Sequence, residues 1–250
     1  MFIVDAHQHL GSCRVFDLNQ TEEDLLAAMD QNGVAAAVVQ PLPGAPDAVA
    51  VHGRIAELSR QHPGRIFGMV NLNPHTDPGK YFAEAARCVR ELGFVAVKLH
   101  TIGHAVLPLS KDAEMVFDTA RQLGVPVMVH TGAGIPFASP SLIIPRARQF
   151  PDVKIVLAHS GGSILSAEAY VTAKECPNVY LETSWCPSTD IAWMVRDLGA
   201  NRVMLGADLV GNMATELTKY RSQGLSESEL EASMGRTAIE VYNLKLGAAK

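Results

Sequence analysis

The strongest constraint on this fold is a repeating alternation between short apolar, β-branched runs and longer amphipathic stretches. The apolar runs are continuous, which is typical of strands that are covered on both faces. They begin near Ile3, Val34, Ile66, Phe94, Val125, Val153, Val179 and Arg202. Successive starts lie roughly 24 to 32 residues apart, the length of one strand with its following helix. Eight such units in 250 residues predict an α/β fold, a closed (β/α)8 TIM barrel.

The stretches between these runs carry helix-end signals. Thr21–Gly33 begins with a capping threonine and acidic residues and ends on glycine, and Asp77–Gly93 and Ser110–Gly124 repeat the scheme. Ser226–Leu244 resembles a closing pair of short helices or one broken helix. An open doubly wound sheet would alternate in the same way but usually has fewer strands. Because no polar linker interrupts the pattern, we expect a single domain over residues 1–250.

Composition limits the classes of binding partner and the cellular compartment that we expect for this protein. A net charge of −5 argues against nucleic-acid and anionic-membrane binding, so a small-molecule substrate is expected. The most apolar stretch, residues 33–51, is broken by three prolines and cannot span a bilayer as a regular helix. The N-terminal residues lack the basic region and apolar run of a signal peptide. Four scattered cysteines without a CxxC pair favour a reducing, cytoplasmic location.

Five of the nine histidines fall at the C-terminal ends of predicted strands. In a barrel these ends form the catalytic face. His7 and His9 form an HxH pair on one face of the first strand, and the two rings can converge on a metal if the chain curls there. Two unrelated polar residues are the alternative for this pair. Asp5 has the same parity and is either a partner of a ligating histidine or a buried charge.

Other strand ends carry further candidates. His130 and His159 each follow an apolar run, where an imidazole is costly unless a metal or a reaction needs it. A satisfied core histidine is the alternative for each. Asp208 closes the eighth strand and would lie beside the first strand in a closed barrel, as a ligand or base rather than a helix cap. His52, His62, His75 and His104 are expected on the surface.

Lys98 and His100 share one face of the fourth strand by the same parity. The lysine could be carbamylated to bridge two metals, hold an anionic substrate, or form a buried salt bridge. Ser184 and its neighbours Glu182 and Trp185 end the seventh strand and could line the pocket, although their parity is ambiguous.

The chain resembles the amidohydrolase superfamily, specifically the amidohydrolase-related branch that includes aminocarboxymuconate-semialdehyde decarboxylase. The matching segments cover almost the whole chain in the expected order: DAHQHL (5–10), GFVAVKLH (93–100), PVMVHTG (126–132), KIVLAHSGG (154–162), VYLETS (179–184), LGAD (205–208) and the tail MGRTAIEVYNL (234–244). Two positions depart from the family pattern. Ala207 stands where a serine is common, and Thr237 where an asparagine is common.

The resemblance implies a divalent metal at the barrel mouth, zinc first, with manganese and magnesium as alternatives. The residues it assigns as ligands are His7, His9, His130 and Asp208. His159 and Asp208 would be the acid/base groups of a metal-dependent hydrolase that acts through a metal-activated water on a small carboxylate, lactone, amide or ester. Substrate contacts are expected from Lys98, His100, Ser184 and Arg14, the last of these more often a surface residue.

Three alternatives remain at this point. The same residues would serve a non-oxidative decarboxylase, a carbon–carbon lyase. A two-metal form would need Lys98 modified, with His130 and His159 on the second ion. A non-catalytic metal-binding barrel is a third, less favoured interpretation. The loops Leu10–Gln20 and Pro41–Gly53 carry few charges, and the second of them either covers the mouth or packs in the interface of a homodimer.

Overall fold

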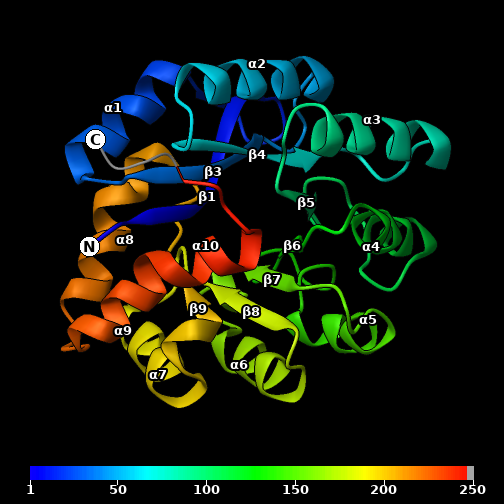
Figure 1. Cartoon of the computed structure of the whole chain (residues 1–250). Helices are drawn as coiled ribbons and strands as arrows, with labels where there is room; N and C mark the ends of the chain where they lie inside the picture. The colour runs from blue at the N-terminus through cyan, green and yellow to red at the C-terminus, as the bar shows by residue number, and fades with distance from the viewer. Residues whose placement is uncertain (247–250) are drawn as a thin grey trace.

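The computed structural model describes residues 1–246, which fold into a barrel of strands surrounded by helices (Figure 1). The strands are β1 Val4–Cys13, β2 Leu18–Gln20, β3 Ala36–Pro41, β4 Ile66–Asn71, β5 Ala96–Leu99, β6 Val127–His130, β7 Ile155–Ala158, β8 Val179–Glu182 and β9 Val203–Met204. The helices are α1 Glu22–Asn32, α2 Ala48–Gln61, α3 Pro78–Arg90, α4 Lys111–Leu123, α5 Ile143–Gln149, α6 Ser166–Glu175, α7 Ser188–Leu198, α8 Met213–Arg221, α9 Glu227–Glu231 and α10 Thr237–Tyr242. Short 3-10 turns span Pro140–Leu142, His159–Gly161, Ala200–Arg202 and Val210–Asn212, and a π-helical turn, Ala232–Arg236, joins α9 to α10.

The barrel is closed between its first and last strands. Strands β1, β3, β4, β5, β6, β7, β8 and β9 pair in parallel in that order. The backbone N–H of Ala6 donates to the Leu205 carbonyl at 3.0 Å, and that of Asp208 to the His7 carbonyl at 2.7 Å. These bonds, with a parallel bridge between Gln8 and Asp208, join the chain directly after β9 to β1. The predicted (β/α)8 barrel is therefore confirmed.

The predicted strands start within two residues of the observed ones, but the chain differs from expectation in two loops. The segment Leu10–Gln20 contains a hairpin, because β1 continues to Cys13 and pairs antiparallel with β2. The second loop is shorter than expected, because helix α2 begins at Ala48 with Asp47 as its N-cap.

Two helices end as their sequences indicate. The Thr21 side chain accepts the N–H of Asp24 at the start of α1, and Ser110 caps α4 by accepting the N–H of Ala113. Gly33 and Gly124 terminate these helices in the left-handed conformation, which glycine adopts without steric cost. Such caps each contribute about 1 kcal/mol of helix stability. Helix α3 ends earlier than predicted, at Arg90 instead of near Gly93.

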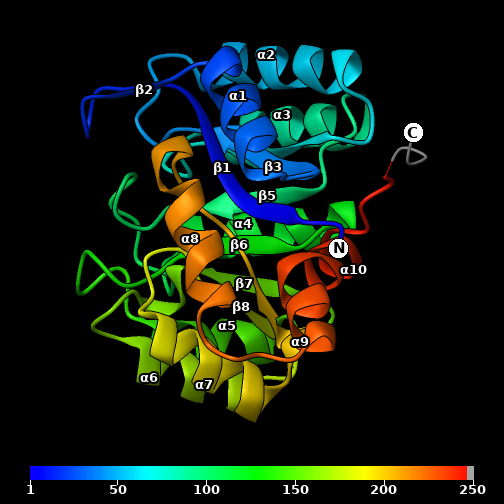
Figure 2. The ribbon, with the colours of Figure 1, turned by 90° about the vertical axis from the view of Figure 1, so that its left-hand side faces the viewer.

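The apolar core has two parts, one inside the barrel and one between the strands and the outer helices. The inner cluster contains apolar side chains such as Ala36, Val38 and Met128, and Val241 and Tyr242 of α10 close it at the N-terminal ends of the strands. Figure 2 shows α10 and the N-terminus on one side of the barrel and β2 on the other. Among residues 1–246, none of the helices has the length and apolar character needed to cross a membrane.

Candidate metal centre

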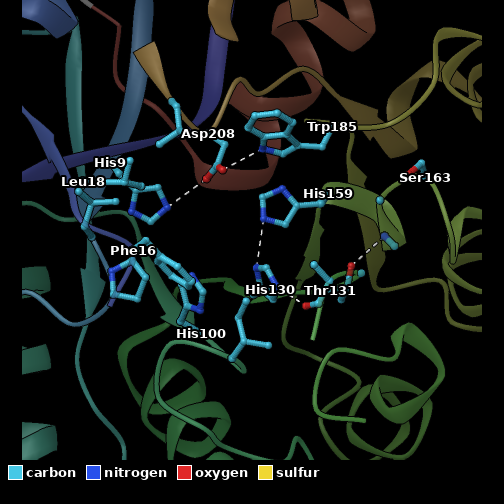
Figure 3. A pocket seen from close by; sticks show the side chains of 18 of the residues that line it. His9, Phe16, Leu18, His100, His130, Thr131, His159, Ser163, Trp185 and Asp208 are labelled. Atoms are coloured by element: carbon cyan, nitrogen blue, oxygen red, sulfur yellow. Dashed lines mark hydrogen bonds and ion pairs between the residues drawn. The ribbon is translucent and has the colours of Figure 1, made fainter. Parts of the chain in front are cut away.

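A cavity of about 510 Å³ opens at the C-terminal ends of the barrel strands (Figure 3). Four histidines and one aspartate from five different strand ends converge on it: His9, His100, His130, His159 and Asp208. His7 is fully buried and lies against His9, which lines the cavity. The structure thus brings together the residues that the sequence places at separate strand ends.

His7 and His9 reach the mouth because β1 is irregular. The register between β1 and β3 shifts between Asp5 and Gln8. Ala6 belongs to the inner apolar cluster, and the shift lets its neighbour His7 also face the interior. The Nε2 atoms of His7 and His9 consequently lie 3.2 Å apart.

The hydrogen bonds of these two rings fix where their protons lie. His7 Nδ1 is 2.8 Å from Glu182 Oε2, and His9 Nδ1 is 3.1 Å from the Pro41 carbonyl oxygen. A carbonyl and a carboxylate only accept, so each Nδ1 carries the proton and donates. Each Nε2 therefore presents a lone pair, and the two lone pairs face one another.

Asp208 completes a three-atom cluster. Its Oδ1 lies 3.4 Å from His7 Nε2 and 3.2 Å from His9 Nε2. Three electron-donating atoms with no proton between them repel one another unless a cation lies among them. Tetrahedral zinc with its usual bond lengths separates such ligand atoms by about 3.3 to 3.5 Å. The cluster therefore fits a divalent cation, and Lys98, with its Nζ 3.1 Å from His7 Nε2, is the side-chain cation beside it.

His130 and His159 form a second pair of facing nitrogens. His130 Nε2 donates to the Ala133 carbonyl at 2.9 Å, which leaves a lone pair on Nδ1. His159 Nδ1 lies 2.8 Å from Ser184 Oγ, whose hydroxyl donates to Glu182 at 3.0 Å. His159 Nε2 is thus left as an acceptor, 3.2 Å from His130 Nδ1. Within the described residues His130 stands outside the cluster of His7, His9 and Asp208.

Electrostatics favour the protonation states that bind metals. Burial lowers the pKa of His7 and of His159 well below the usual range, and lowers that of His130 to about 4. Burial would raise the pKa of Asp208, but the surrounding imidazoles, His7 first, hold it well below the usual range. Neutral imidazoles and an ionised carboxylate are the forms that coordinate cations.

Glu182 supports this centre, a role that sequence parity left open. Its buried carboxylate accepts from His7 Nδ1, from the backbone of Ser184 at 2.6 Å and from the backbone of His159 at 3.2 Å. Gly206 makes room for it, because a Cβ at that position would overlap the carboxylate. In the sequence, the glycine of LGAD, Gly206, is the one sign that a bulky group packs against this position. Glu182 therefore helps to orient both His7 of the three-atom cluster and His159 of the second histidine pair.

Replacing Glu182 by glutamine is expected to weaken metal binding about 10- to 100-fold, because the amide keeps the size but removes the charge that makes His7 a strong donor. Competition with a chromophoric chelator measures the affinity. Glu175→Gln, at an exposed position of α6, is the matched control and should bind metal as the unaltered protein does. Equal affinity in both variants would contradict the role given to Glu182.

The backbone at this end of the barrel is strained. His159, Trp185 and Asp208 have φ values of 65°, 67° and 67°, a left-handed region that non-glycine residues seldom occupy. Such strain concentrates at functional sites. The Trp185 indole N–H donates to Asp208 Oδ2 at 2.9 Å, so Asp208 presents its other oxygen to His7 and His9.

The sequence matches the family described as Amidohydrolase over residues 4–244. The chain belongs to the amidohydrolase family. No significant match was found among curated proteins. Three solved structures similar to this amidohydrolase are 12–16% identical to it in sequence, so they show its fold alone.

These three structures differ in the activity, if any, that is named for each. The 5-carboxyvanillate decarboxylase of Novosphingobium aromaticivorans, complexed with manganese, is 16% identical with a TM-score of 0.77, over 97% of this chain and 96% of that one. An uncharacterised TIM-barrel protein of Bordetella bronchiseptica is 14% identical with a TM-score of 0.81, over 98% and 99%. A probable 2-pyrone-4,6-dicarboxylic acid hydrolase of Acinetobacter baumannii is 12% identical with a TM-score of 0.67, over 97% and 100%.

Some residues that were expected to contact the substrate or a ligating histidine do not do so in the structure. Arg14 is exposed in the β1–β2 hairpin and does not line the cavity. Ser184 is fully buried behind His159. The Asp5 carboxylate contacts no imidazole among residues 1–246; it accepts the backbone N–H groups of His7 and Ala207, each at 3.0 Å, and so ties β1 to the chain after β9.

Two histidines expected on the surface are not there. His52 is fully buried and His104 is half-buried. His52 bonds Glu84 at 2.9 Å through Nδ1 and accepts the N–H of Asn71 at 3.2 Å through Nε2. The Asn71 side chain donates at 2.8 Å to the Pro41 carbonyl that also holds His9. A buried histidine in helix α2 was missed because an amphipathic pattern does not reveal hydrogen-bond partners on a neighbouring strand.

Proposed function

We propose that this amidohydrolase is a metal-dependent hydrolase acting on a small lactone, ester, amide or carboxylate, with zinc as its first expected metal. The observation that carries the proposal is the convergence of His7 Nε2, His9 Nε2 and Asp208 Oδ1 within 3.4 Å of one another. A bound divalent cation supplies Lewis acidity, which activates water at neutral pH. The remaining chemistry is assigned to side chains of this chain.

Asp208 is suited to take a proton from the attacking water. Its carboxylate is ionised, lines the cavity and is held through Oδ2 by Trp185. Once protonated, it can return the proton to the leaving group. The Trp185 hydrogen bond fixes the orientation of this carboxylate in the cavity.

His159 is suited to act as a second acid/base group beside Asp208. Its Nδ1–H is held by Ser184, which is in turn held by Glu182, so Nε2 is presented as the basic atom. It can shuttle a proton to or from the reacting oxygen. The 3.2 Å approach to His130 also supports the two-metal alternative, in which these two rings share a second ion.

Non-oxidative decarboxylation is the second candidate. It is favoured by the structural likeness to 5-carboxyvanillate decarboxylases, one of them complexed with manganese. In that reaction the carboxylate would lie at the same centre and an acid, His159 or Asp208, would protonate the carbon that loses carbon dioxide.

A substrate panel tests the proposal. Zinc- and manganese-loaded protein is assayed with lactones, esters, amides and aromatic carboxylates, with acid and carbon dioxide release recorded together. Acid release without carbon dioxide is the expected result. Carbon dioxide release would replace the hydrolase by the lyase, and metal-free purified protein of unchanged stability would favour a non-catalytic barrel.

We also place the protein in the cytoplasm. All four cysteines are buried and none forms a disulfide with another. Free thiols persist in reducing compartments.

A further inference from the structure

The walls of the cavity are apolar above the histidines. They include Leu18, Leu42, Pro43, Ile102 and Leu209, with the exposed side chains of Phe16, Ile164 and Trp185 also lining the cavity. The two neighbouring loops, residues 131–139 and 160–165, contain no Asp, Glu, Lys or Arg. The wall therefore offers an apolar surface to whatever part of a substrate extends beyond the metal centre.

In the described part of the chain, no lysine or arginine lines this cavity. Arg14 points from the exposed hairpin, and Lys98 is fully buried against His7. A carboxylate placed against the wall would lose its hydration without gaining a partner, which is costly. The wall therefore disfavours substrates that carry a negative charge on the part that extends beyond the metal centre.

His100 supplies a specific polar contact in the cavity wall. Its Nδ1 accepts the backbone N–H of Gly103 at 3.1 Å, so its proton lies on Nε2. Among residues 1–246 this Nε2–H has no hydrogen-bond partner, although the ring lines the cavity. The ring is held by stacking on His130, with centroids 4.7 Å apart and planes inclined by 11°. It is a fixed donor that awaits an acceptor oxygen.

We propose that the substrate carries its reacting carbonyl on an uncharged apolar body of aryl size, with an acceptor oxygen for His100 and no second carboxylate. The inference rests on the proposed metal-dependent hydrolysis for the identity of the reacting group. It rests on the apolar cavity wall for the character of the rest of the substrate. It separates this chain from the probable 2-pyrone-4,6-dicarboxylic acid hydrolase, whose named substrate carries two carboxylic acids.

Binding of three hydroxamates to zinc-loaded protein tests the body without requiring turnover. Each chelates a metal through the same group, and calorimetry measures its affinity. Benzohydroxamate should bind about 30-fold more tightly than acetohydroxamate, because its ring buries apolar area. 4-Carboxybenzohydroxamate should bind at least about tenfold more weakly than benzohydroxamate. Equal or tighter binding of the carboxylated compound, or no gain from the ring, would overturn the inference.

His100→Phe tests the donor, because phenylalanine keeps a ring against His130 but has no N–H. 4-Methoxybenzohydroxamate, which carries an acceptor oxygen besides the two that chelate the metal, should bind about tenfold more weakly with metal content unchanged. His104→Phe, beside His100 but outside the lining, should bind it as before. An unchanged affinity in His100→Phe would remove His100 from the proposal, and if that variant does not fold, the hydroxamate series on the unaltered protein still decides the substrate class.

Hydrolysis of dihydrocoumarin, an uncharged aryl lactone, separates the two proposals. Hydroxamates that bind in the expected order, with no lactone, ester or amide hydrolysed, would contradict the function and leave the substrate class standing. Hydrolysis of dihydrocoumarin no faster than of its ring carboxylate would contradict the substrate class and leave the function standing.

Discussion

Replacing Asp208 by alanine is expected to abolish hydrolysis and to lower metal occupancy to background. The substitution removes the only anionic atom of the three-atom cluster and also the group assigned to take the proton from water. The His7 and His9 lone pairs would remain, but two neutral nitrogens hold a divalent cation far less tightly than a set that includes a carboxylate. Metal content after dialysis and initial rates on the same preparation measure both effects.

Asp152→Ala is the matched control, because it removes the same charge from an exposed turn at the opposite end of the barrel. Its metal content and rate should equal those of the unaltered protein. His7→Ala should behave as Asp208→Ala does. Retained metal with full turnover in either variant would contradict the assignment of the centre.

Replacing His159 by alanine is expected to lower kcat about 100- to 10,000-fold, the range that a positioned acid/base group contributes, while one metal per chain is retained. The reason is that His159 Nε2 faces His130 rather than the cluster formed by His7, His9 and Asp208. His75→Ala, which removes an exposed histidine, should leave both quantities unchanged.

The metal content of His159→Ala also separates one ion from two. Loss of one of two bound metals in this variant would show that His159 ligates, and would favour the arrangement in which it shares a second ion with His130. Full turnover would contradict any catalytic role for it.

The sequence predicted the barrel because each strand is marked locally. Continuous apolar runs and capped helices such as Thr21–Gly33 depend on neighbours in the chain, so they can be recognised without tertiary information. The parity of Lys98 and His100 was also regular, since both follow Ala96 of the inner cluster by even steps and are buried.

What could not be predicted depends on irregular backbone and distant partners. The shift in β1 changes which residues share a face, so parity alone wrongly grouped Asp5 with His7 and His9. Glu182 follows Tyr180, which packs against the inner cluster, by two residues in β8, but its contacts with His7 and His159 depend on strands that are distant in sequence. Neither feature has a local signal in residue type, because each arises where strands that are distant in sequence meet.

The central claim is that His7, His9 and Asp208 hold a divalent cation. Anomalous scattering at the zinc absorption edge from crystals of the zinc-loaded protein tests it most directly. The claim predicts a peak within about 2.0 to 2.2 Å of His7 Nε2, His9 Nε2 and an oxygen of Asp208. A zinc-loaded, active protein whose anomalous peak lies elsewhere, or which shows none at this cluster, would contradict it.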